Sequence, residues 1–306
     1  MLEATSSHLS VSPQGPVLSR IVAGVMKWGV WGANYTPQEI RQLIEQSVEV
    51  GITSFDHADI YGGYTTEETF GKALQLQPEL RAHIQLITKC GIQLIGEQRP
   101  HTRVKHYDTS YAHIIQSVDQ SLKNLQTDYI DLLLLHRPSP IMDPQEIAKA
   151  FEEVVRLGKV RFVGVSNFSP AQFDMLKSAC PLVTNQVEAS ILHRTPFLDG
   201  TFTQCQTHQL APMAWSPLGG GALFASDPTP EVARLRQAAA PMMQKYDLAI
   251  DQLLLLWLMH HPADIIPVLG TTKAHRLASA AKVIGMEMEL QDWFILWEAV
   301  EGEEVP

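Results

Sequence analysis

Four side chains that could move a proton stand near the ends of short apolar segments. Asp56 ends the segment ITSFD and Tyr61 follows it by five residues, while Lys89 lies near the end of IQLITKC and His136 ends YIDLLLLH. A phenol, with a reference pKa of about 10, is a poor acid at neutral pH, but a nearby ammonium favours the phenolate and so makes the phenol a better proton donor. A carboxylate would keep that lysine charged, and a histidine can polarise a carbonyl. Together they would protonate a carbonyl oxygen while another group supplies a hydride.

Each of the four residues also has an ordinary structural explanation. Asp56 alone is more often the cap of a turn or helix, and Tyr61 an aromatic residue at the rim of a pocket. Lys89 alone at a strand end is usually solvated, and His136 after four leucines is often a core histidine with satisfied hydrogen bonds. The chemical interpretation therefore depends on the elements that bring the four together.

Eight short apolar segments alternate with longer amphipathic ones along the chain. They cover residues 21–28, 52–56, 84–90, 129–136, 160–166, 182–188, 211–217 and 264–270. Most are continuously apolar, which is typical of parallel strands that are covered on both faces. The intervening segments predict helices, as the periodicity of residues 108–126 and 143–158 indicates.

The second of these helices has clear signals at both ends. Asp143 can cap its start, Pro144 suits the first turn, and Glu146 is expected to complete a capping-box-like start. Gly158 follows the end as a C-cap, and the next apolar segment begins two residues later. This short return is what a right-handed βαβ unit requires.

Eight such units in 306 residues predict a (β/α)8, or TIM, barrel. A doubly wound sheet is the alternative, but no G-x-G-x-x-G follows an early strand. We expect one domain over residues 1–306, with 1–20 as an N-terminal extension and 286–306 as an outer C-terminal helix and tail. Trp293, Leu296 and Trp297 would form the buried stripe of that helix. A barrel places its chemistry at the C-terminal ends of the strands, where the four residues stand.

Composition and charge favour a soluble protein that acts on a small molecule. The chain is 45% hydrophobic and 18% charged, which suits a sizeable core. A net charge of −10 without a Lys/Arg run argues against nucleic acid or an anionic membrane as the main partner. The longest purely apolar run, 253–259, is too short to span a bilayer.

Cysteine usage and the N-terminus point to the cytoplasm. Cys90, Cys180 and Cys205 are an odd, widely spaced set, which is typical of a reducing compartment rather than of a disulfide framework. The first twenty residues lack the apolar core of a signal peptide. We therefore expect a cytoplasmic protein, and nothing in the sequence requires more than a monomer.

Taken together, the motifs resemble those of the aldo-keto reductase family. FDHADIYG is similar to that family's D-[ST]-A-x-x-Y-G segment, ITKC to its strand-three lysine and LLLLHRP to its strand-four histidine. VRFVGVSNF, TNQVE, AWSPLGGG and IPVLGTTKAHRL follow in the family's order and spacing. The resemblance extends from about residue 20 to about residue 285, and the phrases DHADIYGGY and PMAWS resemble a bacterial branch of oxidoreductases.

The resemblance implies NADPH-dependent reduction of an aldehyde or ketone to an alcohol. It implies that Tyr61 is the general acid, with Lys89 and Asp56 as charged partners and His136 as neighbour, and that Trp28 lines the substrate pocket. NADP(H) is the implied cofactor. The residues implied to hold it are Ser166, Asn167 and Gln186 at the carboxamide, Trp215 on the nicotinamide ring, Ser216, Leu218 and Gly219 at the pyrophosphate, and Thr271, Lys273 and Arg276 at the 2′-phosphate.

Three positions depart from the family's pattern. His57 replaces a small Ser or Thr, and this bulkier polar residue would either alter the pocket floor or merely fill it. Gly270 stands where many relatives carry a lysine for the 2′-phosphate, and Ala280 where many carry an asparagine for the adenine. The expectation of NADP(H) over NAD(H) therefore depends on Lys273 and Arg276, because a guanidinium fork and an ammonium both suit a phosphate.

Two other functions remain as alternatives. A sensor or regulatory protein that binds a nicotinamide cofactor and turns over weakly would keep the same cofactor residues, but it has less need of the complete set of four. A metal-dependent barrel hydrolase needs clustered His and Asp ligands, and only His136 and Asp56 qualify, so no metal site is predicted.

The sequence does not name the substrate. The long loops GIQLIGEQRPHTRVKHYD and GGGALFASDPTP are expected to determine specificity, because barrel enzymes vary their substrates through their loops. The first of these loops is basic, with Arg99, Arg103, Lys105 and His106. It would either favour acidic substrates or be a solvated loop, and the second interpretation is favoured.

Overall fold

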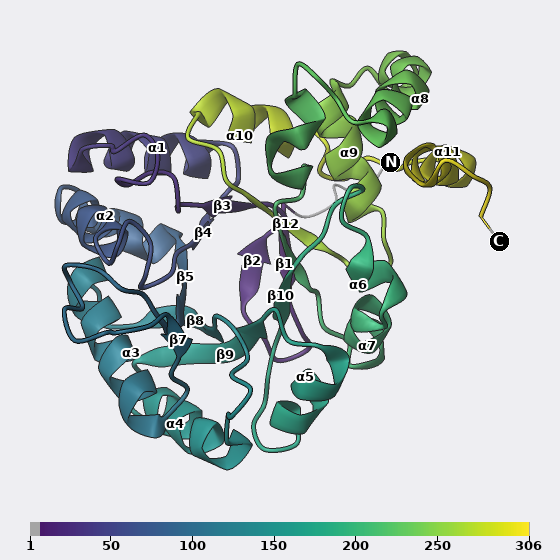
Figure 1. Cartoon of the computed structure of the whole chain (residues 1–306). Helices are drawn as coiled ribbons and strands as arrows, with labels where there is room; N and C mark the ends of the chain where they lie inside the picture. The colour runs from purple at the N-terminus through teal and green to yellow at the C-terminus, as the bar shows by residue number, and fades with distance from the viewer. Residues whose placement is uncertain (1–6, 306) are drawn as a thin grey trace.

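The computed structural model describes residues 7–305, and a closed barrel of parallel strands forms its centre (Figure 1). In order around the barrel the strands are β3 (Val22–Gly24), β4 (Ser54–Asp56), β5 (Gln85–Cys90), β8 (Ile130–Leu135), β9 (Val160–Ser166), β10 (Asn185–Glu188), β11 (Met213–Trp215) and β12 (Ile266–Leu269). β12 pairs back onto β3 and closes the ring. Each barrel strand lies inside one of the eight apolar segments, so the predicted (β/α)8 barrel is confirmed.

Helices form the outer layer and return the chain to the start of the next strand (Figure 1). They are α1 (Pro37–Glu49), α2 (Thr66–Gln75), α3 (Tyr111–Leu125), α4 (Pro144–Arg156), α5 (Pro170–Lys177), α6 (Thr195–Leu198), α7 (Thr201–Thr207), α8 (Pro230–Tyr246), α9 (Ile250–Met259), α10 (Ala274–Ala281) and α11 (Leu290–Glu301), with 3-10 helices η1 (Pro78–His83) and η2 (Gly219–Phe224). Their buried faces pack against the outward side chains of the strands, which explains why the strand segments read as continuously apolar.

The start of α4 differs in one detail from the sequence expectation. Asp143 caps the helix as predicted, because its side chain accepts hydrogen bonds from the backbone N–H groups of Gln145 and Glu146. Glu146 does not complete a capping box. Its Oε1 instead accepts from the backbone N–H of Tyr111 at 3.0 Å, at the start of α3. The carboxylate therefore ties two neighbouring helices together, and sequence spacing within one helix cannot show such a partner.

A short hairpin closes the barrel at the N-terminal ends of its strands. β1 (His8–Ser10) and β2 (Val17–Ser19) pair antiparallel, and both lie across the ring in Figure 1. Val11 and Leu18 are fully buried and pack in one cluster with Leu132 and Met213. The described part of the expected N-terminal extension is thus a floor for the barrel, while residues 1–6 lie outside the described residues.

The last helix packs on the outside of the barrel. Leu296 of α11 is fully buried, whereas Trp293 and Trp297 of the predicted stripe are half-buried. The indoles of Trp257 and Trp293 stack at 4.8 Å, and each ring N–H donates to the other residue's backbone carbonyl. This stack fixes α11 against α9. Within residues 7–305, no helix is long and apolar enough to cross a membrane.

Candidate active site

A single ammonium joins three of the four predicted proton-transfer residues. Asp56 is the last residue of β4, and Lys89 is the second-last residue of β5. Both side chains are buried, with 3% and 1% of the residue exposed. Lys89 Nζ donates to Asp56 Oδ2 at 2.6 Å, to the carbonyl of His57 at 2.8 Å and to the hydroxyl of Tyr61 at 3.3 Å. All three N–H donors of the lysine are therefore used: one binds a carboxylate, one a backbone carbonyl and one the phenol.

The loop after β4 brings the phenol to this ammonium by a tight turn. The backbone N–H of Tyr61 donates to the carbonyl of Ala58 at 3.1 Å, and the carbonyl of Tyr61 accepts from Thr65 and Thr66 at the start of α2. Gly62, immediately after the tyrosine, has a φ of 64°, and a Cβ there would come within 2.6 Å of Thr66 Oγ1. Glycine is thus required at this turn, and the GG pair of the sequence serves to orient Tyr61.

His136 and Trp31 lie near the phenol ring. The ring centroids of Tyr61 and His136 are 6.1 Å apart at 80°, and the backbone N–H of His136 donates to the carbonyl of Cys90 at 2.9 Å. The indole of Trp31 is 6.4 Å from the phenol ring and 45% exposed. The structure thus brings all four predicted residues together. It adds Trp31, whose direction the sequence could not indicate because a loop has no periodicity to orient a side chain.

Burial and charge act against each other on the phenol and the ammonium. Burial raises the pKa of Tyr61 and outweighs the opposite effect of Lys89, so the phenol keeps its proton at neutral pH. Burial by itself would lower the pKa of Lys89, but the attraction of Asp56 and Tyr61 more than reverses this, and the pKa is raised. The arrangement is a protonated phenol held against a charged lysine.

Both histidines of this region are neutral. Burial, followed by the charges of Lys89, Arg137 and Lys105, holds the pKa of His136 well below its usual value. Burial and then Lys89 lower the pKa of His57 to about 3. The ring of His57 packs edge-on against Phe70 at 4.3 Å, and neither ring nitrogen has a hydrogen-bond partner among the described residues. Of the two roles left open for His57, the structure therefore favours filling space behind the site.

A chain of amide and hydroxyl groups leads from Asp56 to the next strands. Gln186 Nε2 donates to Asp56 Oδ1 at 2.8 Å, and the carbonyl of Gln186 accepts from Ser166 Oγ at 2.8 Å. Asn167 Nδ2 donates to Ser166 Oγ at 2.8 Å, and Trp215 Nε1 donates to Asn167 Oδ1 at 3.0 Å. The four residues expected around a nicotinamide thus form one network, which is connected to Lys89 through Asp56.

This network offers the groups that a carboxamide needs. Asn167 has a left-handed backbone with φ of 62°, which turns its amide toward Ser166 and Trp215. The amide nitrogen of Asn167 donates to Ser166 Oγ and to the backbone carbonyl of His136, the latter at 3.1 Å. The amide oxygen accepts from Trp215. Donor and acceptor are both present within one side chain, so the residues fit an amide-bearing cofactor.

The residues expected at the two phosphate positions lie on separate turns. Ser216 has a φ of 51°, and Leu218 is the residue that precedes η2. Gly219 has a φ of 64°, a left-handed conformation that favours glycine. Lys273 begins α10, and its backbone N–H donates to Thr271 Oγ1 at 3.1 Å.

Thr271, Lys273 and Arg276 belong to one turn. Lys273 and Arg276 are exposed, and neither pairs with a carboxylate among residues 7–305. The backbone N–H of Arg276 donates to the carbonyl of Lys273 at 3.0 Å. Two unpaired cations that are held by one turn suit a phosphate monoester.

Trp28 belongs to the hydrophobic core. Its side chain is fully buried, stacked on Phe70 at 6.3 Å and edge-on to Phe55 at 6.0 Å. Its ring N–H donates to the carbonyl of Thr271 at 3.0 Å. These contacts give Trp28 a structural role in holding the turn before α10, and the expected role in the substrate pocket stays a prediction. Sequence position alone did not show to which side of the strand end the indole points.

No group of three or more His, Cys, Asp or Glu side chains in the described part of the chain could hold a metal ion. The candidate site combines a lysine-centred group that could transfer a proton with a neighbouring amide network, at the C-terminal ends of β4, β5, β8, β9, β10 and β11.

Comparisons with known proteins agree with this architecture. The model of the Aldo/keto reductase family matches residues 20–299. The chain is 46% identical to the uncharacterized oxidoreductase YcsN of Bacillus subtilis, over 94% of this chain and 96% of that protein. It is 43% identical to a 6-dehydroglucose reductase of Agrobacterium fabrum, over 94% and 96%. A glycerol dehydrogenase structure from Gluconobacter oxydans superposes with a TM-score of 0.85 at 22% identity, over 97% of this chain and 95% of that one.

Proposed function

Because the chain belongs to the aldo/keto reductase family, we propose that it reduces an aldehyde or ketone to an alcohol with NADPH and with Tyr61 as the general acid. The family and the oxidoreductase names of its relatives support carbonyl reduction in general. The observation that carries the proposal further is the position of Lys89 Nζ, which contacts the carboxylate of Asp56 and the hydroxyl of Tyr61 at once.

The bound nicotinamide would supply a hydride to the carbonyl carbon. Tyr61 would then give its proton to the carbonyl oxygen, and its raised pKa means that the proton is present at neutral pH. The phenolate left behind would lie 3.3 Å from the ammonium of Lys89. In a buried site this attraction is stronger than in water, so Lys89 would stabilise the charge that develops as the proton leaves.

Asp56 and His136 would have supporting roles. The Asp56 carboxylate is held by Lys89 on one oxygen and by Gln186 on the other, so it keeps the lysine both charged and fixed. His136 is neutral and lies beside the phenol ring. A neutral imidazole has one ring N–H to donate, and we propose that it orients the carbonyl oxygen of the substrate toward the Tyr61 hydroxyl.

The rate should not change where an ordinary histidine titrates. Since burial and nearby cations hold the pKa of His136 well below its usual value, the neutral imidazole persists as the pH falls through the range around 6.5. A profile of kcat for carbonyl reduction is therefore expected to stay flat, within about twofold, between about pH 5.5 and 7.5. A sigmoidal loss of kcat centred near pH 6.5 that disappears in His136→Gln would contradict the neutral assignment.

The cofactor preference should depend on Lys273 and Arg276. We propose that they bind the 2′-phosphate, which NADPH has and NADH lacks. The double variant Lys273→Gln/Arg276→Gln is expected to raise the Kd for NADPH about 30-fold or more, from two lost charge-assisted contacts, and to leave the Kd for NADH within about twofold. Quenching of tryptophan fluorescence measures both constants, because Trp215 would stack on the nicotinamide.

Trp215→Phe provides the control for that optical signal. This variant should keep the preference for NADPH but lose most of the quenching. If Lys273→Gln/Arg276→Gln lost affinity for NADPH and NADH equally, the two cations would not be the groups that recognise the 2′-phosphate.

The direct test of the proposed reaction is consumption of NADPH in the presence of a carbonyl compound. The 43% identical relative from Agrobacterium fabrum is named a 6-dehydroglucose reductase, so 6-dehydroglucose is the first compound to offer, followed by simple aldehydes and ketones. Reduction of any carbonyl compound, at a rate that depends on the hydroxyl of Tyr61, would support the proposal. Saturable nucleotide binding without turnover of any carbonyl would overturn it in favour of the cofactor-sensing alternative.

We also propose that the protein works in the cytoplasm. Cys90, Cys180 and Cys205 are all free and buried, and burial raises the pKa of each thiol. Three unoxidised thiols fit a reducing compartment, where NADPH is the common reductant. Fractionation of cells that express the protein from its own promoter checks this, and recovery with the periplasm or the medium would contradict it.

A further inference from the structure

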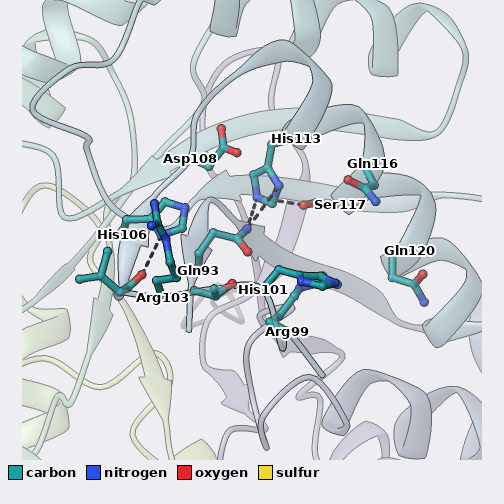
Figure 2. A pocket seen from close by; sticks show the side chains of 12 residues that line it. Gln93, Arg99, His101, Arg103, His106, Asp108, His113, Gln116, Ser117 and Gln120 are labelled. Carbon is teal, nitrogen blue, oxygen red and sulfur yellow. Dashed lines mark hydrogen bonds between the residues drawn. The ribbon is translucent and has the colours of Figure 1, made fainter. Parts of the chain in front are cut away.

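A cavity of about 570 Å³, lined by none of the candidate active-site residues, lies between the long loop after β5 and the helix α3 (Figure 2). The loop leaves through β6 (Ile92–Gln93) and returns through β7 (His106–Tyr107), which pair antiparallel with Gln93 opposite His106. On the helix side the wall consists of His113, Gln116, Ser117 and Gln120, which share one face of α3. We call this space the loop cavity. The reaction proposed above makes no use of it.

The loop side of the wall is strongly basic. Arg99, His101, Arg103 and His106 line it, and Asp108 is the only acidic residue of the lining. Neither Arg99 nor Arg103 forms an ion pair with a carboxylate anywhere in residues 7–305. The chain as a whole carries a net charge of −10, so carboxylates outnumber cations. The two arginines at this cavity are therefore unpaired although carboxylates are in excess in the chain.

The bottom of the loop cavity is polar and fixed. Gln93 and Ser117 are 8% and 5% exposed, and both hydrogen-bond the ring of His113, at 3.0 and 3.2 Å from Nε2 (Figure 2). Burial lowers the pKa of His113, which keeps this ring neutral. The amides of Gln116 and Gln120 continue the same helix face. A ligand would therefore meet neutral hydrogen-bonding groups along α3 and cations along the loop.

Arg99 is held in place without being neutralised. Its guanidinium carbon lies 4.7 Å from the centroid of the Tyr64 ring, and the hydroxyl of Tyr64 accepts from the backbone N–H of Leu94 at 2.9 Å. Stacking on an aromatic ring fixes the plane of a guanidinium while its N–H donors remain free for an anion. Two consecutive turns, closed by Arg99 N to Gly96 O and by Thr102 N to Arg99 O, shape the loop just before and just after Arg99.

We propose that the loop cavity binds a small organic oxyanion of the size of a sugar phosphate. Arg99 and Arg103 would hold the charged group, because guanidinium forks match the oxygens of phosphate bidentately. The glutamine amides of α3 would contact hydroxyl groups on the body of the ligand. A volume of about 570 Å³ lies within the range of small-molecule sites. The basic loop is thus a binding site in its own right rather than only a solvated segment.

Two double variants that each remove two positive charges test this proposal. Arg99→Gln/Arg103→Gln removes the cations of the loop cavity, and Lys273→Gln/Arg276→Gln removes the exposed cations before and within α10. Isothermal titration of the full chain uses glucose 6-phosphate, inorganic phosphate and glucose as probes at fixed ionic strength. The second variant removes the other pair of cations that could bind a phosphate, so it distinguishes binding in the loop cavity from binding at the α10 turn, whether or not the cofactor proposal holds.

Glucose 6-phosphate is expected to bind to the unmodified chain and to Lys273→Gln/Arg276→Gln with Kd values within about twofold, and at least about tenfold more weakly to Arg99→Gln/Arg103→Gln. Binding of glucose 6-phosphate that is tighter than that of inorganic phosphate, with none for glucose, would support a site for the whole ligand. Equal weakening in both variants, loss only in the α10 variant, or no binding of either phosphate would overturn the proposal. So would phosphate and sugar phosphate binding equally, because the amide wall would then have no part.

Discussion

Tyr61→Phe is expected to lower kcat for carbonyl reduction by about 1000-fold or more, while the Kd for NADPH stays within about threefold of that of the unmodified chain. The substitution removes only the hydroxyl that Lys89 contacts and that would carry the proton. The ring itself remains beside His136 and Trp31, so the shape of the site is conserved. Steady-state kinetics and a fluorescence titration with NADPH measure the two quantities on the same preparation.

Tyr107→Phe is the matched control for this experiment. Tyr107 packs against the small cluster of Ala58, Ile60 and Ile92 that Tyr61 also contacts, and its hydroxyl has no hydrogen bond among residues 7–305. The same chemical change at this position should leave kcat within about twofold. If Tyr61→Phe retained a kcat within tenfold of the unmodified chain, the proton would have to come from another group.

Lys89→Met is expected to inactivate the protein and to lower its free energy of unfolding by about 3–5 kcal/mol. Methionine fills a similar volume, so the loss comes mainly from the carboxylate of Asp56. That carboxylate is almost fully buried and, among residues 7–305, would lose its only cationic partner and keep only the amide of Gln186. Urea unfolding measures the change in free energy, and NADPH consumption measures the activity.

The double variant Asp56→Asn/Lys89→Met separates stability from catalysis. Because it removes both charges, it should recover most of the stability that Lys89→Met loses, since a buried pair contributes little over neutral residues of similar size. It should remain inactive, because no ammonium is left near Tyr61. A double variant as unstable as Lys89→Met would show that packing, and not the unpaired carboxylate, causes the loss.

The barrel and the grouping of the four proton-transfer residues follow from features that a sequence displays directly. Continuous apolar runs mark strands covered on both faces, and a parallel barrel puts the C-terminal ends of all its strands on one side. Asp56, Lys89 and His136 stand at or beside such ends, so their convergence needs no knowledge of side-chain direction. Tyr61 follows by a turn that the adjacent glycines make possible.

Features that depend on side-chain direction or on burial were not predictable in the same way. The Gln186–Asp56 bond joins residues 130 positions apart on strands that are not neighbours in the ring, and Trp28 turned out to face the core. The sequence also suggested that Lys89 governs the acidity of Tyr61, whereas burial outweighs it and raises the pKa of the phenol. β6 and β7 have two residues each, too few for any periodicity, so the loop cavity gave no sequence signal beyond its cations.

The closure of the barrel between β12 and β3 has a consequence for the time at which the proposed nucleotide site can form during protein synthesis. Val22 pairs with Val268, and the ring N–H of Trp28 reaches the carbonyl of Thr271 across 243 positions of the chain. β3 is the first barrel strand to leave the ribosome, and one of its edges stays unpaired until β12 has been synthesised. The turn that carries Lys273 directly follows that last strand and is therefore completed late. Nascent chains should gain affinity for NADPH only once this closure has formed. Binding of NADPH would therefore stabilise barrels that have already closed, and it would not assist the earlier steps of folding.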